Sequence, residues 1–131
     1  MKYRLTDETI EKNGITLHRI QATKDFDIVC KGDLGGFIEN EKNLSHEGDA
    51  WVWDDAQVYG NVRVYGDAWV WDDAQVYGNA QVFGNADVYG NAQVFGNALI
   101  YGDAQVSGNA KVHGDAKVYG LAEVCGSWEL L

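Results

Sequence analysis

The sequence predicts an all-β fold in which a β-hairpin cap precedes a single-stranded, three-sided parallel β-helix. A Val or Ile recurs every six residues, thirteen times without a gap, from Val52 to Val124. Two positions before each aliphatic stands Ala, with Val62 as the exception, and two positions after it stands Gly, replaced by Asp at Asp54 and Asp72. Such a fixed-period array indicates a solenoid, because one unit cannot bury its apolar face alone.

Each six-residue unit is expected to form one short strand and one corner. Side chains alternate faces along a strand, so the Ala and the aliphatic point inward together. The following Gly and Asn or Asp are typical of turns with positive φ. Residues 48–65 recur as residues 66–83 with three differences, so one coil contains three repeat units and has three sides. Thirteen units then give just over four coils.

Residues 1–47 are expected to form an N-terminal hairpin and capping segment. Asn13-Gly14 favours a two-residue turn that joins strands over residues 2–11 and 15–23. We expect this hairpin to cover the first coil, because the end of a β-helix exposes unpaired backbone.

The second predicted domain is the β-helix itself, over residues 48–131. Ile38 and Leu44 are expected to begin its core before the strict register starts. At the other end, Trp128 occupies the small inward position and Leu130 the aliphatic position, so we expect these two side chains to plug the open end.

The repeats resemble the hexapeptide repeats of the left-handed parallel β-helix superfamily, over roughly residues 48–130. This resemblance, and not the period, implies a left-handed coil. The leader, with KYRL near its start and GGFIENEKNLSHEGDAWV before the repeats, resembles uncharacterised bacterial and prophage hexapeptide-repeat proteins. Transferases of the superfamily are typically trimers with a catalytic His near an intersubunit cleft, so the resemblance favours a homotrimer.

Composition restricts the classes of function. The formal net charge is −10, with 20 acidic and 10 basic residues, which disfavours binding to nucleic-acid polymers. The first residues lack an apolar signal region and no stretch of about 18 apolar residues occurs, so we expect a cytoplasmic protein without a membrane partner, in a bacterium or, if phage-encoded, in the host. Cys30 and Cys125 are expected to be reduced thiols.

On the first outer face, four of the five Trp residues fall into one block when successive coils are aligned. Three interpretations stay open, since the leader could cover this block, a sister subunit or other partner could bind it, or it could be a platform for a ligand. The block consists of Trp51, Trp53, Trp69 and Trp71.

The second and third faces carry columns of aromatic side chains. Such columns stabilise stacked strands and also suggest assembly. A ligand groove is expected beside the corner between these faces, where aromatic rings could stack a base and a guanidinium could pair with a phosphate. The residues expected to line it are Tyr59, Tyr77, Phe95, Arg63 and Gln81.

Catalytic and metal-binding chemistry have weak candidates. His113 is the one His of the repeats and would be the base of an acyltransferase-like enzyme. Only three His residues occur in the chain, two of them in the leader, so a three-His zinc site is disfavoured and no cofactor is expected. Stacked carboxylates could admit Ca²⁺, although turn formation explains them as well. These carboxylates are Asp54, Asp55, Asp72 and Asp73.

The expected function is that of a non-catalytic, oligomeric binding or interaction module. It would bind a protein partner or a small host ligand such as a nucleotide signal, and a phage origin is one version of this hypothesis. An acyltransferase-like enzyme and a structural component of a phage assembly are the alternatives.

Overall fold

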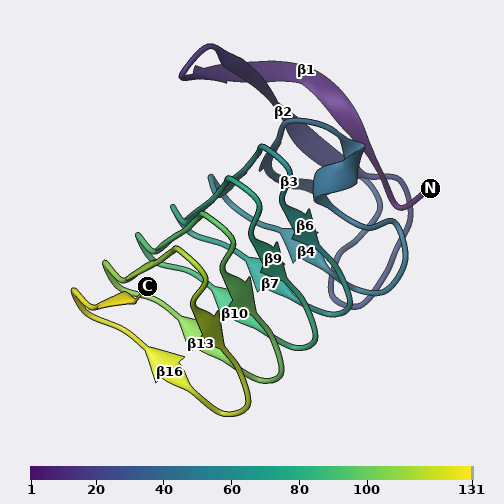
Figure 1. Ribbon diagram of the computed structural model, residues 1–131. Coiled ribbons are helices and arrows are strands. Elements are labelled where there is room, and N and C mark those ends of the chain that lie inside the picture. Colours follow the sequence, from purple (N-terminus) through teal and green to yellow (C-terminus); the bar gives the residue numbers. More distant parts are fainter. Residues whose placement is uncertain (131) are drawn as a thin grey trace.

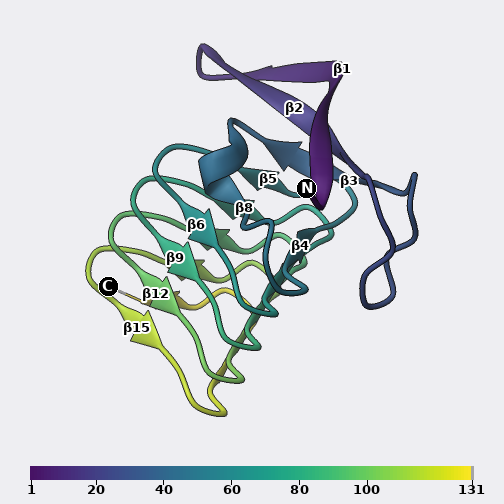
Figure 2. The ribbon, with the colours of Figure 1, turned by 90° about the vertical axis from the view of Figure 1, so that its right-hand side faces the viewer.

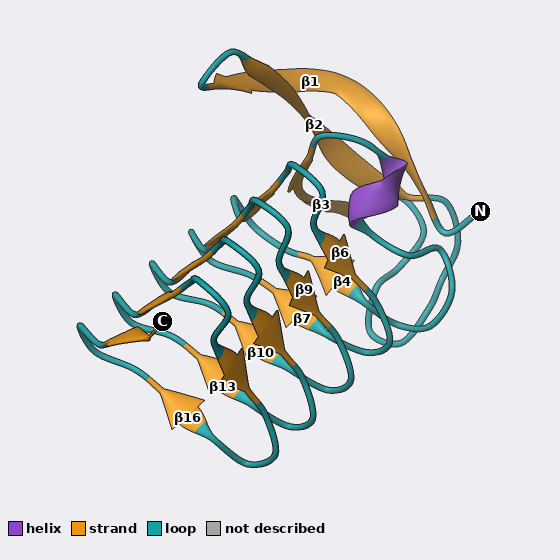
Figure 3. Cartoon of the chain, in the orientation of Figure 1, coloured by secondary structure: helices purple, strands orange, loops and turns teal. Residues whose placement is uncertain are grey.

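The computed structural model describes residues 1–130, and it confirms the predicted all-β fold and three-sided coil. Stacked coils of three strands each form a prism with the N-terminal hairpin at one end and the C-terminal strand at the other (Figures 1 and 2). The coils fit a left-handed parallel β-helix. Each side is a two-residue strand joined to the next by a turn (Figure 3). One turn of 3-10 helix, η1 (Glu41–Asn43), interrupts the leader.

Each face of the prism is a parallel sheet in which every strand pairs with the strand three repeat units away. The strands of the first face are β4 (Trp51–Val52), β7 (Trp69–Val70), β10 (Asp87–Val88), β13 (Gln105–Val106) and β16 (Glu123–Val124). Those of the second face are β5 (Gln57–Val58), β8 (Gln75–Val76), β11 (Gln93–Val94), β14 (Lys111–Val112) and β17 (Glu129–Leu130). Those of the third face are β6 (Arg63–Val64), β9 (Gln81–Val82), β12 (Leu99–Ile100) and β15 (Lys117–Val118).

The core consists of the inward columns of Ala and Val, which are buried from Ala50 to Val118. Corner glycines stack directly on one another. Gly78 has φ +75°, and a Cβ built on it would lie 2.9 Å from the backbone nitrogen of Gly96. Glycine is therefore required at this corner by the backbone conformation and by the close approach of the next coil.

The leader extends one face of the prism as an antiparallel sheet. Strands β1 (Tyr3–Lys12) and β2 (Ile15–Ala22) form the predicted hairpin, with positive φ at Asn13 and Gly14. Strand β2 pairs with β3 (Leu34–Ile38), and β3 pairs in parallel with β5. The hairpin thus continues the sheet of the second face. Its base also lies over the N-terminal end of the prism, because Tyr3 and Ile20 are buried in the same core as Ala50 and Trp51.

The solenoid begins earlier than the strict repeat. Strand β3 lies one layer above β5, and Leu44 forms a parallel bridge with Val64. These segments add a layer, so the solenoid has about five turns rather than just over four. The extra layer has no hexapeptide signature because a 3-10 turn replaces one of its strands.

Two buried polar side chains satisfy backbone groups at the N-terminal end of the coils. In lower coils, backbone N–H groups donate to the corresponding carbonyls, as Trp51 N does to Ala68 O. At the first complete coil, Lys2 Nζ donates to Ala50 O at 2.6 Å. Asn43 Nδ2 donates to the carbonyl oxygens of Gly60 and Val62 at 3.1 and 3.0 Å. Side chains thus supply hydrogen bonds that another coil would make.

The C-terminal end does not match the predicted plug in full. Leu130 packs against the core, but Trp128 is 67% exposed. The inward position that Trp128 occupies in the register holds Ala in the coils above, so an indole does not fit there. Leu131 lies outside the described residues. Both Cys30 and Cys125 are free and exposed. Among residues 1–130, no helix has both the length and the apolar character needed to cross a bilayer.

Candidate functional site

The Trp block on the first face lies partly beneath the leader. Trp51 is fully buried, and its ring contacts Tyr3 and Phe26 edge-on at centroid distances of 6.1 and 5.2 Å. Trp53 and Trp69 are partly buried and pack edge-to-face at 5.2 Å. The leader therefore covers Trp51, one of the four predicted binding residues, and leaves the other three partly accessible.

The three accessible Trp residues line one small cavity. The cavity has a volume of about 240 Å³, and its walls are Trp53, Trp69, Trp71, Asp54 and Ile28 of the leader. Apolar atoms form nearly all of its surface. The sequence grouped the Trp residues correctly but carried no indication that Ile28, which is 63% exposed, would lie beside them.

The four corner carboxylates are largely engaged in the fold. Asp54 Oδ2 accepts a hydrogen bond from Asp72 N, and Asp72 Oδ2 accepts one from Gly90 N, both at 3.2 Å. Asp55 forms an ion pair outside the corner, and Asp73 lines a shallow hollow beside Asp54 and Asp72. Across residues 1–130, no three acidic, His or Cys side chains are grouped so that they could hold a metal ion. These carboxylates are therefore explained by turn formation.

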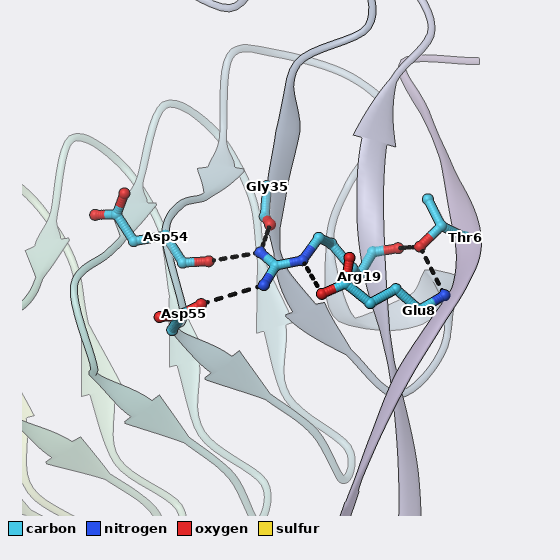
Figure 4. Close-up of polar contacts among 6 residues, drawn as sticks. All are labelled: Thr6, Glu8, Arg19, Gly35, Asp54 and Asp55. Atoms are coloured by element: carbon cyan, nitrogen blue, oxygen red, sulfur yellow. Dashed lines mark hydrogen bonds and ion pairs between the residues drawn. The ribbon is translucent and has the colours of Figure 1, made fainter.

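Arg19 of strand β2 connects the hairpin to this corner (Figure 4). Its guanidinium donates to Glu8 Oε2 at 2.9 Å, to Gly35 O at 2.7 Å, to Asp54 O at 3.1 Å and to Asp55 Oδ1 at 3.2 Å. Burial alone would lower the pKa of Arg19, but the bonds to Glu8 and Asp55 outweigh this effect and raise it. The sequence analysis missed this residue, because nothing in a local motif pairs a hairpin Arg with a repeat corner.

The aromatic column of the second face is also covered at its top. Tyr59, Tyr77 and Phe95 stack at centroid distances of 5.2 and 5.0 Å. Leu17 and Phe37 pack on Tyr59, which is only 6% exposed, and burial raises its pKa. Tyr59 therefore cannot stack a ligand, and the predicted groove that joined it to Arg63 is wrong. The hairpin occupies the ring surface that the groove required.

Arg63 instead faces the segment around η1. It lines a hollow of about 480 Å³ together with Glu41, Lys42, His46 and Tyr65. A second hollow of about 440 Å³ also contains Lys42 and Arg63. Among the described residues, neither cation forms an ion pair. Gln81, the last predicted groove residue, accepts a hydrogen bond from Tyr65 Oη at 3.2 Å.

His113 forms a close pair with an acidic residue of the next coil. His113 Nε2 lies 2.7 Å from Glu129 Oε1, and the ring stacks on Phe95 with an interplanar angle of 1°. A carboxylate only accepts hydrogen bonds, so Nε2 carries a proton, and in the neutral imidazole Nδ1 then carries the lone pair. A base whose ring is oriented by a carboxylate is one arrangement that serves proton abstraction.

The two leader His residues are placed differently. His46 Nδ1 accepts from the backbone N of Lys2 at 3.1 Å, and its Nε2 lies 2.9 Å from Glu41. Both nitrogens of His46 are therefore occupied. His18 Nδ1 lies 3.2 Å from the carbonyl oxygen of Thr6 and anchors the hairpin.

Comparison with known proteins identifies the repeat. Residues 56–71 and 92–108 match the family model described as the YdcK β-solenoid repeat. The chain is 33% identical to a protein named "Uncharacterized acetyltransferase YdcK" from Escherichia coli (strain K12), over 48% of this chain and 24% of that protein. The chain thus covers about a quarter of the length of this curated relative.

The similarity corrects one expectation from the sequence. A non-catalytic module was expected because the repeats contain one His and no extruded loop. The relative is named as an acetyltransferase, which points toward an enzyme rather than a non-enzyme. By its stacked coils and this similarity, the chain is a three-sided β-solenoid with repeats similar to the YdcK β-solenoid repeat.

Proposed function

We propose that the protein transfers an acyl group from a thioester donor to a hydroxyl or amine acceptor, with His113 as the general base. The observation that carries this proposal is the 2.7 Å contact between His113 Nε2 and Glu129 Oε1. The name of the relative from E. coli supports the reaction class.

The geometry supports a simple division of roles. Glu129 holds Nε2–H, and the stacked Phe95 ring fixes the imidazole plane. Nδ1 would remove the proton from the acceptor as its oxygen or nitrogen attacks the thioester carbon. Collapse of the tetrahedral intermediate then expels the thiolate, which takes up a proton from the imidazolium. A positioned general base contributes about 10²- to 10⁴-fold to such a rate.

An assembly of copies would enclose this site. The His113 side chain lies on an open face of the prism, and an acceptor there needs a second wall. Stacked rings on the third face, which end at the 57% exposed Tyr119, favour contact between copies. We therefore include a homotrimer in the proposal, to be measured by size-exclusion chromatography with light scattering.

The test is acetyl-coenzyme A turnover with a panel of sugar, hydroxyl and amine acceptors. Products are detected by mass spectrometry, because exposed Cys30 and Cys125 would react with thiol reagents. We expect His113→Ala to reduce turnover at least about 100-fold. His18→Ala is the matched control and should retain turnover. Equal activity of folded His113→Ala and wild type would contradict the assignment of the base.

A second candidate function rests on the unpaired cations beside η1. Lys42 and Arg63 line both neighbouring hollows and would attract a phosphate-bearing small molecule such as a nucleotide. Native mass spectrometry of freshly purified protein should show the retained ligand. Arg63→Gln installs the residue that the next coil carries at Gln81, so it should release the ligand without harming the fold. A ligand retained equally by this variant would place it elsewhere.

A further inference from the structure

We propose that the cavity between Trp53, Trp69 and Trp71 binds an organic cation of the quaternary ammonium class. The cavity measures about 240 Å³, a size suited to a trimethylammonium group and a short substituent. Three indole rings, Asp54 and Ile28 of the leader line this hollow, which is open to solvent. This inference does not depend on the proposed acyl transfer.

The wall chemistry selects the class of ligand. Nearly all of the cavity surface is apolar, so a ligand with N–H or O–H donors inside it would lose hydrogen bonds to water without replacing them. A quaternary ammonium has no donors and presents only methyl groups. Its charge is attracted by the faces of Trp rings, which bind cations better than those of other aromatic residues. A metal ion or a primary ammonium is less favoured than a quaternary ammonium, because it would give up hydration at these apolar walls.

The charges around the cavity have the sign that this ligand needs. Asp54 lies in its wall, and a hollow lined by Asp72 and Asp73 adjoins it through the same Asp54. No Lys or Arg is among the residues that line either space. Arg19 is the nearby cation, and its ion pair is with Asp55 and not with Asp54. The Asp54 carboxylate accepts a hydrogen bond from Asp72 N and forms no ion pair among the described residues, so no cation neutralises its negative charge beside the rings.

A second carboxylate, that of Asp87, adds negative charge on the same face. Asp87 pairs in register with Trp69 on the first face, one coil below. Burial raises the pKa of Asp87, and the neighbouring Trp71 indole N–H lowers it in part, without the geometry of a full hydrogen bond. A cation above these rings would stabilise the charged form of this carboxylate.

The rings are held in place before any ligand binds. Trp53 and Trp69 pack edge-to-face at 5.2 Å, with an interplanar angle of 68°. Trp71 stacks on Tyr89 at 4.3 Å and 9°. Because the rings are already ordered, binding has little side-chain entropy to lose.

The test is a titration with choline chloride and tetramethylammonium chloride, followed by calorimetry and Trp fluorescence at constant ionic strength. The matched ligand control is 3,3-dimethyl-1-butanol, which has the shape of choline and no charge. We expect choline to bind at least about tenfold more tightly than this alcohol. Equal binding of both would reduce the site to an apolar cavity, and absence of binding for both would overturn the proposal.

Three variants locate the site. Trp71→Leu should weaken choline binding about tenfold, whereas Trp128→Leu, at the exposed far end, should leave it unchanged. Asp54→Asn should weaken binding about threefold. Asn tolerates the φ of +54° at this position and can still accept the hydrogen bond from Asp72 N, so the fold should survive. Equal losses for Trp71→Leu and Trp128→Leu would overturn the proposal, and unchanged melting temperatures confirm that the variants are folded.

Discussion

Replacement of Arg19 by Ala should release the hairpin from the prism while the coils stay folded. The ion-pair partners Glu8 and Asp55 have side chains 56% and 70% exposed, so solvent screens these two contacts to about 0.5 kcal/mol each. Hydrogen bonds to the backbone carbonyl oxygens of Gly35 and Asp54 contribute about 1 kcal/mol each. The guanidinium lies 4.2 Å from the Phe37 ring centroid, which adds about 0.5 kcal/mol. The contacts together stabilise docking of the hairpin by about 3.5 kcal/mol.

Amide hydrogen exchange measured by mass spectrometry resolves this effect. A loss of about 3.5 kcal/mol should speed exchange of the β1 and β2 amides about 300-fold, with little change in β8 to β14. Arg4→Ala is the matched control, because Arg4 makes one exposed contact, to Gln21 at 2.6 Å. Arg19→Lys should give an intermediate effect, since it keeps the positive charge but loses the planar guanidinium that donates to several acceptors at once. If Arg19→Ala and Arg4→Ala exchanged alike, the attribution of docking to this guanidinium would be refuted.

Three further predictions concern the coils and the N-terminal end. Gly78→Ala should lower the free energy of unfolding by about 1 to 2 kcal/mol more than Gly120→Ala in urea titrations, because both have positive φ but only Gly78 has backbone within 4 Å of the new Cβ. Val94→Asp should abolish cooperative unfolding monitored by circular dichroism, since it buries a charge, whereas Gln93→Asp on the outward side should melt within a few degrees of wild type. The pKa of Lys2 is lowered to about 8, mainly by burial, so the folded state holds its proton less tightly than the unfolded chain. Stability relative to Lys2→Met should therefore rise between pH 8 and 10, by up to about 1.4 kcal/mol per pH unit; a flat difference would contradict this burial effect.

The repeat and the turn could be predicted because each depends on local chemistry. The period of Val82 and Val88 determines which side chains are buried, and Asn13-Gly14 has the φ values that a tight hairpin demands. The hairpin's attachment to β3 could not be read in the same way. It depends on pairing between distant segments that share no motif.

The candidate sites show a similar division. The register of three units per coil grouped Trp53 with Trp71, but it could not predict that the leader covers part of the Trp block. The same register contains a diagonal contact. An aromatic or His side chain directly after an aliphatic residue reaches the residue 16 positions later, on the next coil. Tyr77 contacts Gln93 in this way, and His113 contacts Glu129. A search at that diagonal spacing would have found the pair from sequence.

Because the stacked coils are equal in height, the distance between two surfaces along the prism depends on the number of coils between them. The Trp cavity is tied to the leader through Ile28, whereas the His113 and Glu129 pair lies several layers away. Duplication or loss of one coil-length segment, of the kind that residues 48–65 and 66–83 record, would change their separation by one strand spacing of about 4.8 Å. Neither site would need to be rebuilt. The distance between two surfaces in this architecture is therefore set in fixed steps by the number of coils, independently of the chemistry at either one.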